Sequence, residues 1–226
     1  MERRNYRLIE SYMLSCMRDS AHDKEHIYRV LYNAMIIAQK ESNVDYDVLI
    51  GACLLHDIGR QEQFADPTLC HAEIGAEKAL AFLAEQGFDK DYAQQVSRCI
   101  LTHRFRKNRP PESLEAKILF DADKLDVVGA MGIARTLVYN GTLSEPLYSL
   151  LPDGSVSSGA HDAQLSFCQE YKRKLEKLYD YFYTETAAQI AEQRRKIAAD
   201  FYESLYQEAS FAYGYGKEAL EQHVHK

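Results

Sequence analysis

Helical periodicity is the feature of this sequence that most limits what the chain can fold into. Apolar residues recur three or four positions apart in nearly every segment, as expected for amphipathic helices rather than strands. In residues 24–41 the apolar side of the predicted helix consists of Ile27, Val30, Leu31, Ala34, Ile37 and Ala38. The sequence therefore predicts an all-α fold.

Capping and helix-breaking residues predict where the helices begin and end. Asp45 or Asp47 suits the N-cap of a helix that runs to residue 58, where Gly59 is expected to end it with a positive φ. Another predicted helix stops at Gly87. The other predicted helices cover residues 4–18, 24–41, 70–86, 89–103, 113–139, 162–183 and 185–212, and the tail beyond Gly214 is expected to be frayed.

A chain of 226 residues suits one compact domain. We predict a single domain over residues 1–226, with a core at about 20–140 and long helices at 162–213. The intervening loop at 140–161 is rich in Gly, Ser and Pro. The aromatic C-terminal helices are equally suited to cover the core or to form a dimer seam, so the oligomeric state stays open.

Charge and cysteine content narrow the partners and the compartment. The formal net charge of -7 disfavours binding to nucleic acid polymers and to anionic membranes. The five cysteines are scattered, without a Cys-x-x-Cys pair, which disfavours a disulfide framework and structural zinc. With neither a signal-peptide pattern nor an apolar run of membrane-spanning length, we expect a cytoplasmic protein.

The dipeptide His56–Asp57 follows an apolar run that otherwise predicts a buried helix. Burying an imidazole beside a carboxylate costs free energy unless both groups have partners, and a metal ion would be a partner for both. The alternative is that the pair only caps the C-terminus of its helix.

Further polar residues stand in apolar surroundings at other helix faces or ends. They are His26, His71, His103 and the aspartates 121, 123 and 126. Singly, each histidine is explained as a hydrogen-bonded core residue, and Asp121 as the i,i+3 partner of Lys124. Their coincidence in several apolar helices favours one shared site, and imidazoles with carboxylates but without thiolates suit divalent ions such as Mn²⁺, Fe²⁺, Co²⁺, Ni²⁺ or Mg²⁺, or a catalytic Zn²⁺.

Three stretches resemble the motifs of the HD-domain phosphohydrolase superfamily. They are residues 26–30 (His-Ile-Tyr-Arg-Val), residues 54–60 (Leu-Leu-His-Asp-Ile-Gly-Arg) and residues 122–126 (Ala-Asp-Lys-Leu-Asp). The resemblance implies a helical bundle that holds one divalent ion with His26, His56, Asp57 and Asp123.

Residues 71–77 (His-Ala-Glu-Ile-Gly-Ala-Glu) resemble the HD-GYP cyclic dinucleotide phosphodiesterases, and His103 stands where that branch has another ligand. The Gly-Tyr-Pro element is missing, which argues against cyclic dinucleotides. The chain is more similar to stand-alone bacterial HD hydrolases of about this length, whose stretches match residues 114–118, 129–135 and 184–186. That branch implies metal-dependent hydrolysis of nucleotide phosphates, including pyrophosphate release from nucleoside triphosphates.

Within this interpretation the remaining candidate residues take roles around the ion. Glu73 or Asp126 is the candidate base for a metal-bound water. His71 and His103 either bind a second ion or hydrogen-bond a substrate phosphate, and for a single-metal enzyme we favour phosphate binding. Phosphate charge would be neutralised by Arg60 and Lys107, with Arg104, Arg106 and Arg109 as helpers. Arg29 is a further substrate-binding candidate, or forms a salt bridge with Asp57 or Asp123.

Two other functional classes stay open at this stage. One is a di-iron oxygenase, because some HD relatives use a six-ligand set for redox chemistry. The other is a non-catalytic sensor of nucleotides or metals, which would bind its ligand without turnover.

Overall fold

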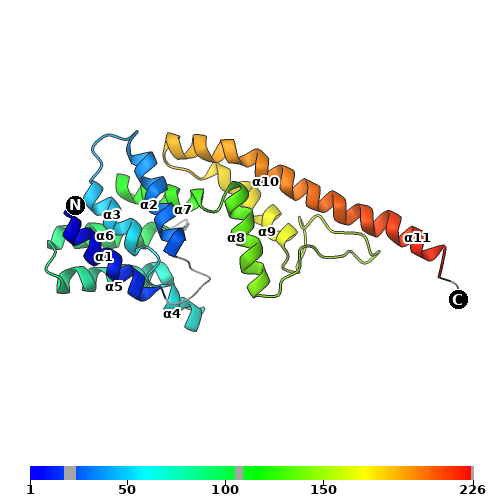
Figure 1. Cartoon of the computed structure of the whole chain (residues 1–226), viewed down its shortest axis with the longest axis horizontal. Coiled ribbons are helices and arrows are strands. Elements are labelled where there is room, and N and C mark those ends of the chain that lie inside the picture. Colours follow the sequence, from blue (N-terminus) through cyan, green and yellow to red (C-terminus); the bar gives the residue numbers. More distant parts are fainter. Residues whose placement is uncertain (18–23, 105–108, 225–226) are drawn as a thin grey trace. The chain divides into compact units, whose positions relative to one another are not determined.

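The computed structural model describes residues 1–17, 24–104 and 109–224 (Figure 1). Within these ranges the secondary structure is helical, apart from one isolated antiparallel bridge between Leu150 and Val156. The prediction of an all-α fold is confirmed. The chain separates into two compact units, Met1–Asp126 with Phe182–Ala187, and Val127–Tyr181 with Ala188–Lys226.

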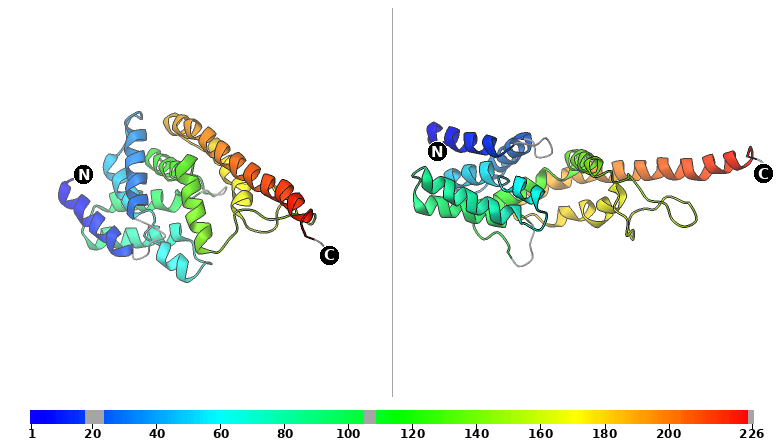
Figure 2. Two further views of the ribbon diagram at one scale, coloured as in Figure 1. Left: turned by 45° about the vertical axis from the view of Figure 1, so that its right-hand side comes forward. Right: turned by 90° about the horizontal axis from the view of Figure 1, so that it is seen from below.

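The first unit is a bundle of helices around α3, as the views in Figures 1 and 2 show. Its helices are α1 (Arg3–Cys16), α2 (Lys24–Ala38), α3 (Tyr46–Leu55), α4 (Arg60–Ala65), α5 (His71–Glu85), α6 (Lys90–Thr102) and α7 (Leu114–Leu125). Helix α3 contacts α1, α2, α6 and α7, and α5 lies along α6.

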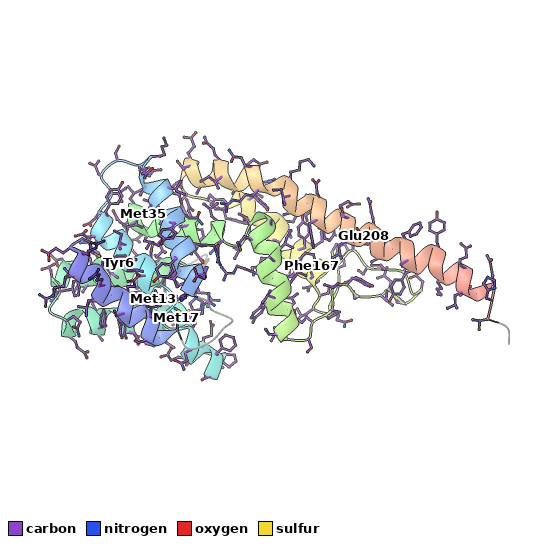
Figure 3. All side chains as sticks on the ribbon, viewed as in Figure 1. Tyr6, Met13, Met17, Met35, Phe167 and Glu208 are labelled. Atoms are coloured by element: carbon purple, nitrogen blue, oxygen red, sulfur yellow. The ribbon has the colours of Figure 1, made fainter. Side chains whose placement is uncertain are left out.

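Helix α3 is central because it is apolar on all sides rather than along one stripe. Leu49, Leu54 and Leu55 are completely buried. Each buried leucine contributes about 1.5–3 kcal/mol relative to exposure. Met13 of α1 (Figure 3) is also completely buried, and the residues that directly follow α3, His56 and Asp57, lie in the same interior.

Several helix ends agree with the sequence analysis. The Asp45 carboxylate caps α3 by accepting hydrogen bonds from the backbone N–H groups of Asp47 and Val48. Gly87 follows α5 with φ +76°, a conformation that favours glycine.

The prediction that Gly59 ends its helix with a positive φ is wrong. Its φ is −93°, and it stands at the N-cap of α4, which lies between two of the predicted helices. Glycine is required here by close approach instead, because a Cβ atom would lie 2.3 Å from the His71 carbonyl oxygen.

The helix predicted over residues 113–139 is also wrong as a single helix. It divides into α7 and α8 (Gly129–Thr142), with a break after Asp126. The break depends on Gly129, which has φ +66° and where an added Cβ atom would lie 2.7 Å from Arg194 Cβ. Asp126 therefore ends α7 rather than lying within a long helix.

The second unit contains α8, α9 (Phe167–Arg173), the 3₁₀ helix η1 (Leu175–Asp180), most of α10 (Glu185–Phe211), the π-helical turn η2 (Ala212–Gly216) and α11 (Lys217–Glu221). Phe167, labelled in Figure 3, lies in its core with Tyr171 and Tyr202. The helix predicted over 162–183 is wrong, because Ser166 caps α9 and the Lys174 backbone (φ −128°, ψ −60°) interrupts it. The tail beyond Gly214 is helical as far as Glu221.

Among the described residues, none of the helices combines the length and the apolar character needed to cross a membrane. The prediction of a single domain stays a prediction, and the candidate site described next lies within the first unit.

Candidate metal centre

Two adjacent groups of ligand-type side chains lie in the interior of the first unit. Group A consists of His26 on α2, His56 after α3 and Asp123 on α7, and group B of Asp57 after α3, His71 at the start of α5 and His103 after α6. Within each group, one ligand atom of each residue lies within 4.8 Å of the others. The structure thus gathers side chains from five separate helices.

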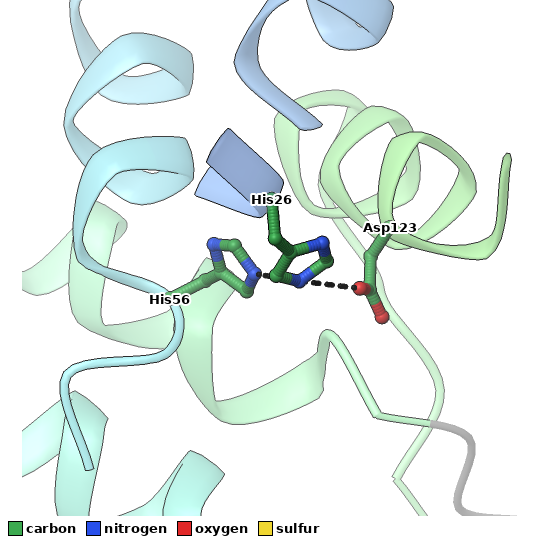
Figure 4. Close-up of side chains that lie close together, drawn as sticks. All are labelled: His26, His56 and Asp123. Atoms are coloured by element: carbon green, nitrogen blue, oxygen red, sulfur yellow. Dashed lines mark hydrogen bonds and ion pairs between the residues drawn. The ribbon is translucent and has the colours of Figure 1, made fainter. Parts of the chain in front are cut away.

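In group A the atoms that face one another are the Nε2 atoms of the imidazoles and a carboxylate oxygen (Figure 4). His26 Nε2 lies 3.4 Å from His56 Nε2 and 3.5 Å from Asp123 Oδ1. His26 and His56 are buried, whereas 14% of the Asp123 side chain is exposed. Group A is therefore enclosed on the histidine side and reaches solvent at its carboxylate.

Group B is more deeply buried. His71 Nε2 lies 3.2 Å from His103 Nε2 and 3.4 Å from Asp57 Oδ1, and His103 Nε2 lies 3.6 Å from the same oxygen. The side chains of all three residues are at most 1% exposed.

Asp57 connects the two groups through its two oxygens. Oδ1 faces group B and accepts a hydrogen bond of 2.9 Å from Arg60 Nε. Oδ2 faces group A, 3.5 Å from His26 Nε2 and 3.8 Å from His56 Nε2. Burial opposes ionisation of this carboxyl, but the positive charge of the Arg60 guanidinium holds its pKa well below the ordinary value. Asp57 is therefore an anion in the interior.

The hydrogen-bond partners of the Nδ1 atoms determine what the four imidazoles can do. His56 Nδ1 lies 2.8 Å from the Cys53 carbonyl oxygen, and His103 Nδ1 lies 2.6 Å from the Ile100 carbonyl oxygen. A carbonyl oxygen only accepts, so Nδ1 carries the proton in both rings. The Nε2 atom of each neutral ring then presents a lone pair to its group.

His26 and His71 are held by side chains instead. His26 Nδ1 lies 2.7 Å from Asp126 Oδ2, and His71 Nδ1 lies 2.6 Å from Gln63 Oε1. Both acceptors again place the proton on Nδ1. This pattern, in which an outer oxygen fixes each ring, is typical of metal-binding histidines.

Burial keeps the imidazoles neutral. Desolvation lowers the pKa of His56 from 6.5 to about 4, against the opposing effect of Asp57. Desolvation likewise lowers the pKa of His71 to about 2. Neutral imidazole is the form that binds a metal ion.

The donor set fits a divalent cation. Asp57 Oδ2 accepts no hydrogen bond from the described residues although the atom is buried. The imidazole Nε2 atoms that face it have no proton to donate. A buried carboxylate oxygen surrounded by lone pairs is costly without a positive charge, which a metal ion would supply.

Three basic side chains at the centre pair with aspartates. Arg60 donates to Asp57 as described above, and Arg29 and Lys124 pair with Asp126 and Asp123. The guanidinium of Arg29 donates from Nε to Asp126 Oδ1 at 2.7 Å and from Nη2 to Asp126 Oδ2 at 3.1 Å. Thus Arg29 pairs with Asp126, whereas the sequence analysis considered Asp57 or Asp123 as its partner. Lys124 Nζ lies 3.1 Å from Asp123 Oδ2, and this ammonium, against the effect of burial, lowers the pKa of the Asp123 carboxyl.

Other residues singled out from the sequence lie outside the two groups. Glu73 is half exposed, forms a salt bridge of 2.8 Å with Arg109 and belongs to neither ligand group. Arg104 Nη1 points to Cys70 Sγ at 3.6 Å. Lys107 and Arg106 lie outside the described residues.

Asp121 has a structural role. Its carboxylate accepts hydrogen bonds from the backbone N–H groups of Tyr183 and Thr184 and from the Thr184 hydroxyl. Asp121 therefore holds the turn before α10 against α7, and its predicted pairing with Lys124 gives way to the pairing of Lys124 with Asp123.

Gln63 and Lys124 are site residues that the sequence analysis did not identify. Gln63 lies on α4, a helix that was not predicted from the sequence. A glutamine eight residues before a histidine is not a recognised motif, so nothing in the sequence indicates its contact with His71. Lys124 adjoins a predicted ligand, and this adjacency is the signal that could have identified it.

Comparison with known proteins identifies the same region. The HD domain family model matches residues 24–128, which include both ligand groups. The uncharacterized protein YpgQ of Bacillus subtilis (strain 168) is 30% identical over 203 residues, which cover 87% of this chain and 90% of YpgQ.

Solved structures extend the similarity beyond the matched region. The crystal structure of Bacillus subtilis YpgQ in complex with ADP has a TM-score of 0.69 and 28% identity, covering 90% of this chain and 97% of that chain. The crystal structure of a predicted HD superfamily hydrolase from an uncultured Thermotogales bacterium has a TM-score of 0.59 and 31% identity, covering 89% and 91%.

Proposed function

The chain belongs to the HD-domain superfamily of metal-dependent hydrolases, and on this premise we propose that it hydrolyses phosphate esters or anhydrides of nucleotides. The reaction that we put first is release of pyrophosphate from nucleoside triphosphates. The observation that carries the proposal is the convergence of imidazole lone pairs on the two oxygens of Asp57.

We assign His26, His56, Asp57 and Asp123 as the residues that would hold a divalent ion. A bound ion of this kind supplies a Lewis acid for a phosphoryl oxygen and lowers the pKa of coordinated water. The nitrogen and oxygen ligands suit Mn²⁺, Fe²⁺, Co²⁺, Ni²⁺, Mg²⁺ or Zn²⁺. Asp123, the partly exposed member, faces the side from which a substrate would enter.

Group B supports a second ion. Its two imidazoles were considered both as ligands and as hydrogen-bond donors to a phosphate. A donor role needs a proton on Nε2, but the partners of Nδ1 in His71 and His103 place the proton on the other nitrogen. Two Nε2 lone pairs 3.2 Å apart, with Asp57 Oδ1 beside them, favour a cation instead.

Asp126 is better assigned to holding His26 than to accepting the proton of a water molecule. Both of its oxygens already accept hydrogen bonds, from His26 and from Arg29. A carboxylate in this position fixes the ring and raises its basicity as a ligand.

Arg60 and Arg29 are suitable contacts for phosphate oxygens. Each has about a third of its side chain exposed while its Nε donates to a buried aspartate, with values of 30% for Arg60 and 31% for Arg29. Each guanidinium therefore extends from the buried centre to solvent. Charge-assisted hydrogen bonds from such groups stabilise the negative charge that develops in phosphoryl transfer.

A nucleotide substrate is supported by the related YpgQ, one crystal structure of which is a complex with ADP. The diphosphate of such a ligand is the type of group that the two guanidiniums and a divalent ion would bind. Base and sugar preference do not follow from these contacts.

The direct test is a hydrolysis screen. Metal-free protein would be reloaded with Mn²⁺, Mg²⁺, Co²⁺ or Ni²⁺ and incubated with nucleoside triphosphates, diphosphates and simple phosphate esters, with Asp57→Ala as the negative control. We expect metal-dependent release of pyrophosphate or phosphate by the unmodified chain alone. Metal retention without hydrolysis of any of these substrates would overturn the proposal in favour of a sensor.

A di-iron oxygenase is the second candidate function, favoured by the presence of two ligand groups that share Asp57. It predicts iron in the purified protein and consumption of O₂. Nucleotide hydrolysis under anaerobic conditions would exclude it as the main activity.

A further inference from the structure

His71 is the one histidine of the centre whose proton position depends on an uncharged side chain. The rings of His56 and His103 are fixed by the carbonyl oxygens of the residues three positions earlier in their own chain segments. His71 is the first residue of α5, so no preceding helical turn offers such a carbonyl. Its Nδ1 instead faces the amide of Gln63, at 2.6 Å.

An amide side chain can present either oxygen or nitrogen, so a further contact must decide its orientation. The backbone carbonyl of Leu69 provides it. Gln63 Nε2 donates to the Leu69 carbonyl oxygen at 3.0 Å, which leaves Oε1 toward His71. The reversed amide would place two acceptor oxygens against each other.

The position of Gln63 is fixed by the attachment of α4 to α5. Gly59 packs directly on the start of α5, with no room for a Cβ atom. Lys78 of α5 donates to the Ile58 carbonyl oxygen at 2.8 Å and to Glu62 at 2.6 Å. These contacts hold the short helix at the distance that the amide needs to reach the ring.

We propose that Gln63 is a positioning residue that sets the tautomer of His71 and thereby decides whether group B binds a cation. With the proton on Nδ1, the ring offers a lone pair beside His103 Nε2 and Asp57 Oδ1. With the proton on Nε2, the ring would present an N–H group there and repel a cation. This inference rests on the second ion of the proposed function.

The test uses three variants of the full chain. Gln63→Leu removes the acceptor, and Gln63→Glu keeps an acceptor at the same position. Gln61→Leu, on the exposed side of α4, is the matched control for loss of a glutamine from this helix. Thermal unfolding establishes that each variant is folded before it is compared.

The first readout is independent of metal and activity. In metal-free protein with ¹⁵N-labelled histidine, long-range ¹H–¹⁵N spectra report which nitrogen of His71 carries the proton, with His71→Gln used for assignment. We expect the Nδ1–H tautomer in the unmodified chain, in Gln61→Leu and in Gln63→Glu. Gln63→Leu should populate the Nε2–H tautomer.

The second readout is binding of Mn²⁺, by titration calorimetry and by metal analysis after gel filtration. Outer partners of metal-binding histidines change metal affinity by about 10–100-fold. We expect that loss for the second ion in Gln63→Leu, with the first ion unchanged and Gln63→Glu near the unmodified chain.

An Nδ1–H tautomer and unchanged second-ion affinity in Gln63→Leu would overturn the proposal, as would an Nε2–H tautomer in the unmodified chain. If the unmodified chain binds only one ion, the proposed second ion fails while the tautomer spectra still decide the role of Gln63. If Gln63→Leu is unfolded, Gln63→Met replaces it in both readouts, because methionine has nearly the length of glutamine but lacks the amide oxygen that accepts from His71 Nδ1.

Discussion

Group A and group B use the same residue types but differ in how they meet solvent. Group A includes Asp123, which is 14% exposed and paired with Lys124, whereas each side chain of group B is at most 1% exposed. A substrate needs access and a supporting cation needs only ligands. The difference indicates that group A is where phosphate would react, and group B is where a second charge would support it.

The largest expected effect comes from the residue that the two groups share. Asp57→Ala removes one oxygen from each group, so neither retains a metal ion. We expect loss of metal after gel filtration and a decrease in hydrolysis larger than the about 10–100-fold typical of outer partners. Turnover equal to that of the unmodified chain would refute the site.

Separate substitutions in group A and group B should show what each group contributes to metal binding and to hydrolysis. Asp123→Ala should remove the ion of group A and reduce hydrolysis to background. His103→Leu should remove only the ion of group B, giving half the bound metal and a partial loss of activity. If each variant keeps one ion but His103→Leu loses all hydrolysis and Asp123→Ala retains part of it, then group B rather than group A is where phosphate reacts.

The carboxylate that holds His26 offers a finer test of group A. Asp126→Asn weakens the hydrogen bond to Nδ1 and the pairing with Arg29. We expect a decrease of about 10–100-fold in affinity for the first ion, without effect on the second. Calorimetric titration with Mn²⁺ measures both affinities, and an unchanged first affinity would contradict the role given to Asp126.

Acid should destabilise the metal-free protein through histidines of both groups. The pKa values of His56 and His71 are lowered from 6.5 to about 4 and about 2, since burial disfavours the charged rings. As the pH falls below 6.5, these histidines bind protons in the unfolded chain but not in the folded chain, so the free energy of unfolding decreases. The decrease continues to about pH 4 for His56 and to about pH 2 for His71. We expect Tm to fall by at least about 5 °C between pH 7 and pH 4, and bound metal to reduce the fall down to the pH at which it dissociates. A flat profile would show that these rings do not remain neutral.

The smallest effect is expected at Glu73, outside both groups. Its salt bridge with Arg109 is exposed, and such pairs contribute about 0–1 kcal/mol. Glu73→Gln should leave hydrolysis within about twofold, since general-base catalysis would be worth about 100-fold or more. A loss of that size would restore Glu73 as the base.

The sequence by itself determined the helical class and the residues of both groups. Helices follow from local periodicity, and His56–Asp57 stands out because polar residues interrupt an otherwise apolar segment. Asp45 and Gly87 were predictable as helix ends for the same reason, since capping depends on neighbouring residues alone.

Tertiary structure decided which atoms of those residues meet. The pairing of Asp126 with His26 joins positions 100 residues apart, and Gln63 reaches His71 from a helix that local periodicity did not predict. Gly59 and Gly129 were misjudged because the neighbours that require glycine there, the His71 carbonyl and the Arg194 side chain, come from other parts of the chain. Ligand type is a property of single residues, but proton position and burial depend on contacts that form only when the helices pack.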